Sequence, residues 1–289
     1  MTDTPSSVKR AASPGPITRG ITAVGRSVDG QLHRGASAVR YVGGIGYLAG
    51  DTAAALTQGL LLGKAKFNWT ALGTQMVRVG IRSIPIVMVV QVFIGMILAL
   101  QMAPTLATYG QLERVAEVVA IAVIRELGPL LTAVVLSGFA GASIAAEIGA
   151  MVESEEIKAL RAHALNPIRF LVVPRVVGTT IMIVALAVIA DYIGIAGGFL
   201  TGVAVLDVPP RLYLNLTQGA LKTTDFATGL LKAGVFGAVI AMIACYEGLR
   251  VTGGPEGVGR ATTATVVKSI VSLIGIDALF TAVFYTYGI

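Results

Sequence analysis

Residues 83–112 contain no Asp, Glu, Lys or Arg, and residues 84–100 are almost wholly apolar, with Gln91 as the one polar side chain. About 20 helical residues, each rising about 1.5 Å, cover the roughly 30 Å hydrocarbon core of a bilayer. The stretch therefore predicts a membrane-spanning helix. The composition agrees, since 55% of the 289 residues are hydrophobic and 13% are charged, whereas soluble domains carry about 25% charged residues.

Four further stretches have a similar apolar character, so we expect an all-α membrane protein with about five transmembrane helices. The predicted spans are residues 83–101, 117–146, 170–204, 226–247 and 264–288. The third span is long and contains the glycine cluster Gly194, Gly197 and Gly198. We expect this span either to tilt strongly or to break at the glycines.

The N-terminal part is more polar. Residues 1–34 are rich in Ser, Thr, Pro and Gly, carry several Lys and Arg and lack a hydrophobic signal region, which predicts a disordered basic cytoplasmic tail. Residues 36–62 are apolar but are interrupted by Arg40 and Asp51. A spanning helix here would separate the cations of the tail from those of residues 64–82, whereas an interfacial helix keeps them on one side. We therefore favour an interfacial helix and a cytoplasmic N-terminus.

Residues 147–175 form a polar segment between two long uncharged stretches. Within it, residues 152–164 contain good helix formers and neither Gly nor Pro, and Asn166-Pro167 ends this predicted helix. Two interpretations are equally open. The segment is either an amphipathic helix at the membrane surface that presents a face to a soluble partner, or a solvated loop that happens to be helical.

Among the polar side chains inside the predicted spans, we single out Gln91, Asp191 and Asp277 as candidate functional groups. Ionisable groups are costly in hydrocarbon, so Asp191 is either a functional group or lies nearer the interface than the predicted span suggests. Gln91 either lines a polar passage or pairs with a neighbouring helix. An ion-coupled secondary transporter would use Asp191 and Asp277, and such a carrier is the alternative function. The single cysteine and two distant histidines predict no metal site.

Four strings of the sequence resemble the MlaE/YrbE family of ABC transporter permeases. They are residues 93–101, 125–129, 146–175 and 257–263. The strongest of them contains Glu-Glu-Ile-Lys-Ala-Leu followed by Asn-Pro-Ile-Arg and Leu-Val-Val-Pro-Arg. The composition and the long basic tail look most similar to the YrbE permease subunits of actinobacterial (mycobacterial) Mce lipid transport systems.

The resemblance implies an MlaE-like permease fold over residues 35–289, with an N-terminal interfacial helix and a cytoplasmic coupling helix at residues 152–164. It implies that this helix contacts an ATPase through Glu155, Glu156, Ile157, Leu160, Arg161, Asn166 and Pro167. The chain lacks a Walker A sequence, so the permease is expected to be non-catalytic. ATP and Mg²⁺ would bind to a separate cytoplasmic ATPase dimer.

The resemblance also implies a plasma-membrane lipid transporter that works with MCE-domain lipid-binding proteins on a lipid or fatty acid. The expected substrate cavity lies at a subunit interface and includes Phe93, Met96, Leu100 and Phe139. The chain departs from the family at Phe139, where Arg is common. This loss of a cation suggests a heterodimer with a second YrbE-like permease that keeps the Arg. The net charge of +6 predicts no nucleic-acid binding, because in membrane proteins Lys and Arg set the topology.

Overall fold

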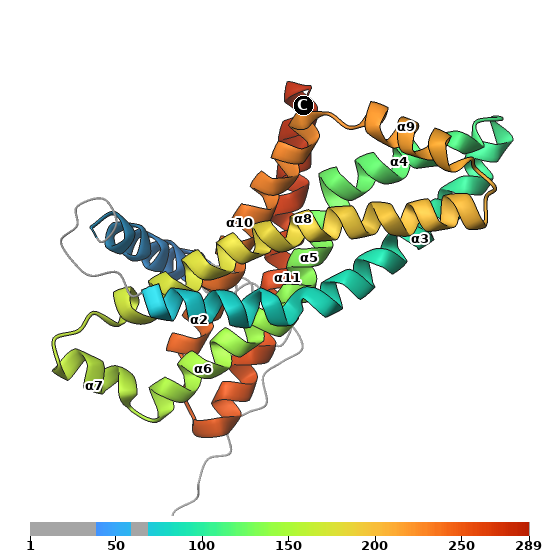
Figure 1. Ribbon diagram of the computed structural model, residues 1–289. Helices are drawn as coiled ribbons and strands as arrows, with labels where there is room; N and C mark the ends of the chain where they lie inside the picture. The colour runs from blue at the N-terminus through green and yellow to red at the C-terminus, as the bar shows by residue number, and fades with distance from the viewer. Residues whose placement is uncertain (1–38, 59–68, 289) are drawn as a thin grey trace, which may run out of the picture. The chain divides into compact units, whose positions relative to one another are not determined.

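The computed structural model describes residues 39–58 and 69–288, and all regular structure within these ranges is helical (Figure 1). Contacts divide the chain into the units Met1–Tyr47 and Leu48–Ile289, and the sites discussed below all lie in the second. The predicted disordered tail lies outside the described residues. The predicted interfacial helix is described only over residues 39–58, which are helical, and its position at the membrane stays a prediction.

Five helical segments within the described residues are long and apolar enough to cross a membrane. They are Trp69–Thr108, Leu112–Glu153, Ile168–Ala204, Thr223–Leu249 and Gly254–Tyr287. The prediction of an all-α membrane protein with about five transmembrane helices is therefore confirmed.

Short 3₁₀-helical and π-helical segments interrupt the α-helices of the first three spans. Their bounds are α2 (Trp69–Val79), η2 (Ile81–Ser83), α3 (Ile84–Thr108), η3 (Leu112–Arg114), α4 (Val115–Ala122), η4 (Val123–Leu127), α5 (Gly128–Leu136), η5 (Ser137–Gly141), α6 (Ala142–Glu153), α7 (Glu156–Ala162), η6 (Ile168–Val172) and α8 (Val173–Ala204). The segments η4, η5 and η6 are π-helical. The chain ends with α9 (Pro210–Ala220), α10 (Thr223–Leu249) and α11 (Gly254–Tyr287).

Several predicted boundaries differ from the structure. The first span ends later than expected because α3 continues through Pro104 to Thr108. The last helix begins ten residues earlier than residue 264, since Gly253 adopts a left-handed conformation with φ of 92° and Pro255 occupies the first turn, both of which favour a helix start. The predicted internal loop is correspondingly short.

The glycine cluster does not break the third span, so that alternative is wrong. Helix α8 is continuous from Val173 to Ala204, and it packs along α3 (Figure 1). A Cβ on Gly95 would overlap with the backbone carbonyl of Gly194, and one on Gly197 would overlap with the carbonyl of Val92. The glycines therefore let two helix backbones touch, which is how helices associate in lipid without a hydrophobic driving force between them.

Helix α9, like α2, was not predicted from the sequence. Helix α9 lies within the stretch that the sequence indicated as an outer loop, and it begins at Pro210. Its buried residues, Tyr213 and Thr217, are four positions apart and therefore share one face. The Tyr213 ring packs edge-on against Phe199, with the ring centroids 5.4 Å apart.

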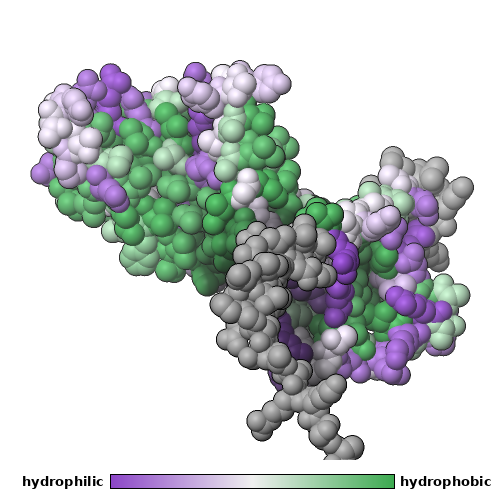
Figure 2. Space-filling view, turned by 180° about the vertical axis from the view of Figure 1, so that it is seen from behind, coloured by the Kyte–Doolittle hydropathy of each residue, from purple (hydrophilic) through white to green (hydrophobic). Residues whose placement is uncertain are grey.

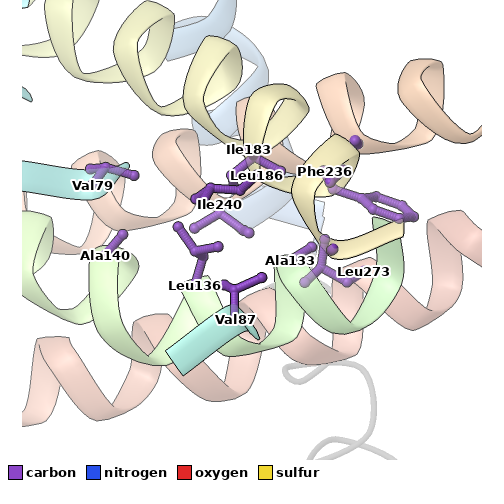
Figure 3. Close-up of a cluster of buried hydrophobic side chains, with 13 residues drawn as sticks. Val79, Val87, Ala133, Leu136, Ala140, Ile183, Leu186, Phe236, Ile240 and Leu273 are labelled. Carbon is purple, nitrogen blue, oxygen red and sulfur yellow. The ribbon is translucent and has the colours of Figure 1, made fainter. Parts of the chain in front are cut away.

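The largest buried cluster joins the spanning helices at the middle of the bundle (Figure 3). In Figure 3, Leu136 of α5, Leu186 of α8 and Ile240 of α10 point toward one another. Hydrophobic residues also cover much of the surface visible in Figure 2, with hydrophilic residues gathered along its edges. A broad apolar surface of this kind would be a liability in water but is required of a chain surrounded by lipid.

The close contact between α3 and α8 predicts the effect of a single methyl group. Gly95→Ala should destabilise the protein by about 1–3 kcal/mol, because the new Cβ meets backbone that cannot rotate away. The measurement is thermal unfolding of the purified protein in detergent. Gly275→Ala in α11 is the matched control, since nothing lies within 4 Å of its Cβ position; a similar loss in both variants would contradict the prediction.

Candidate functional site

The polar segment between the second and third spans forms a short helix bounded by two left-handed residues. Helix α6 ends at Glu153, and Glu155 has a φ of 61°. Helix α7 then covers Glu156–Ala162, which is shorter than the predicted 152–164. At its end the Leu165 amide donates to the Leu160 carbonyl at 3.0 Å and the Ala164 amide donates to the Arg161 carbonyl at 3.0 Å. This is the Schellman arrangement, here with Ala164 at φ 58° where Gly is usual.

Helix α7 exposes part of the predicted ATPase contact and buries another part. Glu155, Glu156, Arg161 and Asn166 are exposed, while Leu160 and Pro167 are half-buried. Ile157 differs from the expectation, because it is 7% exposed and packs into a core cluster with residues of α6, η6, α8 and α10. Within this chain Ile157 anchors the helix, and the charged residues form its outer face.

Asn166 and Lys158 stabilise the local conformation at α7. The Asn166 Oδ1 accepts a hydrogen bond from the Ile168 amide at 2.9 Å, which turns the chain into η6. The Lys158 ammonium lies 2.6 Å from a Glu155 carboxylate oxygen and holds the pKa of Glu155 below its usual range. A lowered carboxyl pKa stabilises the fold above the unfolded pKa, and this contribution is lost as the pH falls through the folded pKa. The pair is exposed, so its contribution is small.

Behind α7, Glu147 of α6 bridges two arginines from other helices. One carboxylate oxygen pairs with Arg78 of α2, and the other lies 3.2 Å from Arg175 of α8. Ser143 also donates to Glu147 at 3.2 Å. The side chains are only partly exposed, so the pairs are better shielded from water than surface pairs. The carboxylate therefore ties α2 to α6 and α8, the helices that precede and follow α7.

A second charged cluster lies between η4, α10 and α11. Lys232 is 2% exposed, and its ammonium lies 2.6 Å from Glu126 and 2.9 Å from Asp277. Thr281 also lies 3.1 Å from the Lys232 ammonium. Asp277 is thus a structural partner of Lys232, a pairing that the sequence analysis did not predict. The sequence did contain the evidence for this pairing. Lys232 and Asp277 are opposite charges inside two apolar helices, and such charges are expected to pair.

Arg125 and Glu126 are neighbours in the sequence but pair with different residues. Arg125 lies 3.6 Å from Asp225, whereas Glu126 pairs with Lys232. Both residues sit in the π-helical turn η4, where adjacent side chains point in different directions. The groups line a cavity of about 550 Å³ together with residues near the C-terminal end of α11. This cavity has charged groups of both signs at one end of the bundle.

Gln91 and Asp191 both lie against Gly128 at the start of α5. Gln91 is 1% exposed, and its amide nitrogen lies 3.5 Å from the Leu127 carbonyl and 3.4 Å from the Gly128 carbonyl. These distances are long for hydrogen bonds. Asp191 is 3% exposed, so its side chain is buried among the helices of this chain, and its depth in the membrane stays a prediction. Gln91 therefore pairs loosely with a neighbouring helix, as one of its two interpretations predicted.

Of the four predicted substrate-cavity residues, three are exposed and one is half-buried. Phe93, Leu100 and Phe139 are 57%, 45% and 43% exposed, and Met96 is half-buried. Phe139 lies in η5 and lines a cavity of about 310 Å³ with Arg78, Arg82 and Glu147 among its neighbours. The exposed residues of α3 face away from α8 and are available to lipid or to a second subunit.

The fold and these sites define a multi-pass α-helical membrane protein with a short charged helix between its second and third spans. The model of the family described as Permease MlaE matches residues 72–283, which is most of the chain. The chain therefore belongs to the MlaE permease family, a family of ABC transporter permeases.

Relatives with curated descriptions agree with this family. A probable ABC transporter permease protein of Rickettsia felis is 40% identical over 211 residues, covering 73% of this chain and 82% of the relative. The intermembrane phospholipid transport system permease protein MlaE of Haemophilus influenzae is 32% identical over 233 residues, covering 80% and 89%. A probable ABC transporter permease protein of Synechocystis is 38% identical over 199 residues, covering 69% and 76%.

The strained end of α7 predicts a stabilising substitution. Ala164→Gly should raise the free energy of unfolding by about 1 kcal/mol, because glycine adopts the left-handed conformation without the steric cost of a Cβ. The thermal unfolding midpoint of the purified protein checks this. Ala162→Gly, two residues earlier and inside the helix, should have the opposite effect of about 1 kcal/mol. Equal effects of both variants would show that Ala164 is not strained.

The Lys232 cluster predicts a large loss of stability from one substitution. Lys232→Met should cost about 3–5 kcal/mol, because it leaves two carboxylates without their shared cation in a poorly solvated site. Unfolding in detergent, followed by circular dichroism, measures the loss. Lys158→Met removes the cation of an exposed pair and should leave the unfolding midpoint nearly unchanged. A stable Lys232→Met protein would refute the structural role of the cluster.

Proposed function

We propose that this chain is the membrane-spanning subunit of an ATP-driven lipid transporter and that a separate cytoplasmic ATPase dimer moves it through α7. ATP and Mg²⁺ would bind to that ATPase, and the permease itself would be non-catalytic. The observation that carries the proposal is the position of α7. Its charged face is exposed, while Ile157 fixes its inner face to the cluster formed by the second, third and fourth spans.

The coupling follows from how α7 is attached. A rigid displacement of α7 acts on α6 through the turn at Glu155 and on α8 through η6. Glu147 links these two helices to α2 through Arg78 and Arg175. Packed helices respond to such a push as rigid bodies. Closure of the ATPase dimer would therefore shift the second and third spans together with the start of the first.

The substrate is proposed to be a lipid or fatty acid. Family membership and the name of the Haemophilus relative, which refers to phospholipid transport between membranes, support the class of substrate. Phe93, Leu100 and Phe139 expose apolar side chains on α3 and η5. A lipid chain held between two such surfaces, one from each of two permease subunits, would be shielded from water.

The proposed partners extend to both sides of the membrane. We infer a second YrbE-like permease beside this chain, with MCE-domain proteins on the far side that accept or deliver the lipid. The inferred assembly is an actinobacterial type of Mce system in the plasma membrane, with the N-terminus in the cytoplasm. Its support is the sequence strings, the basic N-terminal region and Phe139 in place of an arginine.

Charge reversal on α7 tests the ATPase contact. The chain is purified from native membranes, and co-purifying proteins are identified by mass spectrometry, for the wild type and for Glu155→Lys with Glu156→Lys. We expect the double variant to lose the ATPase by tenfold or more, because two repulsive charges replace two attractive ones at the interface. The second permease and the MCE proteins should remain.

Glu256→Lys is the matched control, since Glu256 is also an exposed acid, with 84% of its side chain accessible, near the start of a different helix. This variant should keep the ATPase. Retention of the ATPase by the double variant would contradict the role of α7. A wild-type chain that purifies without any ATPase would contradict the ATP-driven mechanism as a whole.

A further inference from the structure

Asp191 is a carboxyl group inside a spanning helix without a cation beside it. It lies on α8, 3% exposed, and its Oδ1 atom is buried without a hydrogen-bond partner. Asp277, the other aspartate near mid-span, contrasts with it because Lys232 lies 2.9 Å away. The two aspartates therefore occupy different electrostatic environments and do not share one site.

The groups around Asp191 supply acceptors and close packing. A Cβ on Gly128 would overlap with the Asp191 Oδ1 atom, so the carboxyl group rests directly on the backbone of α5. Gln91 points its amide nitrogen at the Leu127 and Gly128 carbonyls, and its Oε1 atom is also buried without a partner. That oxygen lies 3.5 Å from the Cβ position of Gly194, three residues after Asp191 on the same face of α8.

Most charged groups on the helices around α8 have ion-pair partners of their own, including Glu247 beside Lys268, whereas Arg169 of η6 and Arg211 of α9 form no ion pair within the described residues. Helices α3 and α5 carry none. On the remaining elements Arg125 lies beside Asp225, Lys232 beside Glu126 and Asp277, Glu117 beside Arg114, and Arg78 and Arg175 beside Glu147. Tyr213 of α9 packs against Gly198 and Gly202, farther along α8. Among the described residues, no cation forms an ion pair with Asp191.

An ionised carboxylate in such a site would lack both water and a counter-charge, which is costly in a membrane interior. A bound metal ion would need several oxygen ligands around it, and the contact with Gly128 leaves no such space beside Oδ1. A proton needs no space. A proton on Asp191 would also supply a hydrogen-bond donor. The buried oxygens of Asp191 and Gln91 have no other hydrogen-bond partner.

We propose that Asp191 is a proton-binding site within the bundle, occupied when α8 is packed against α3 and α5. The proton sits on an Asp191 carboxyl oxygen and is donated toward Gln91 Oε1. When α8 moves away from α5 and water enters, the carboxyl group ionises and the proton passes to water. The packed arrangement is therefore favoured at low pH. This inference concerns the permease chain alone and holds or fails independently of the ATPase contact.

Infrared spectroscopy of the purified, full-length protein tests the protonation state directly. The wild type is prepared with ¹³C-labelled and with unlabelled aspartate, and the carbonyl stretch of protonated aspartic acid is sought in the difference spectrum at neutral pH. We expect one band that disappears in Asp191→Asn and persists in Asp277→Asn, because the Asp277 carboxylate lies beside Lys232. Absence of any protonated-aspartate band in the wild type would overturn the proposal.

The result does not depend on the Asp191→Asn variant folding. The other buried aspartate is Asp225, and the remaining described aspartates, Asp51 and Asp207, are exposed. Among the aspartates that the structure describes, a wild-type band that survives in both Asp225→Asn and Asp277→Asn therefore belongs to Asp191. A band that vanishes in Asp225→Asn or Asp277→Asn but persists in Asp191→Asn would show that another carboxyl group carries the proton. That result would reject the inference.

Thermal unfolding across pH tests the link between the proton and helix packing. Asparagine has the shape of neutral aspartic acid, so Asp191→Asn and the wild type should unfold at similar temperatures in acid. As the pH rises, the wild type alone should lose stability, because its packed form must hold a proton that becomes scarce. A constant difference between the two proteins at all pH values would show that packing and protonation are not linked.

Discussion

A charge placed in hydrocarbon must be paired, neutralised or carried to the edge of the membrane, and the arrangement of the spanning helices follows from this constraint. Glu147 joins three helices because two arginines converge on it. Lys232 joins three elements because two carboxylates converge on it. Each cluster ties segments that are far apart in the sequence, so the paired charges act as fixed points between which the apolar helices pack.

The Glu147 cluster and the Lys232 cluster have different roles. The Glu147 cluster lies behind α7, where it can pass a displacement of that short helix to α2, α6 and α8. The Lys232 cluster lies between η4, α10 and α11 and lines a charged cavity. Asp191 is the exception to the pairing, and its contact with Gly128 shows that the exception is built into the packing. A group whose charge depends on helix separation suits a protein whose spans must move.

Much of the fold could be predicted because long uncharged stretches have few alternatives to spanning a membrane. The same local reasoning left open a break at the glycines of α8, whereas close contact with α3 accompanies a continuous helix there. It also placed the end of α7 too late, since the Leu165 and Ala164 amides cap the helix although no Gly or Pro is present. The burial of Ile157 could likewise not be predicted from the sequence. An apolar stripe on a helix can face either a partner protein or the rest of the same chain.

The sequence by itself determined the class of protein, the number of spans and the polar segment between the second and third of them. These features depend on composition over about 20 residues, and every such stretch meets the same solvent. Only the tertiary structure decided which charges meet. Arg125 and Glu126 are neighbours in the chain but pair with Asp225 and Lys232, because side-chain direction in a packed bundle, and not sequence distance, selects the partner.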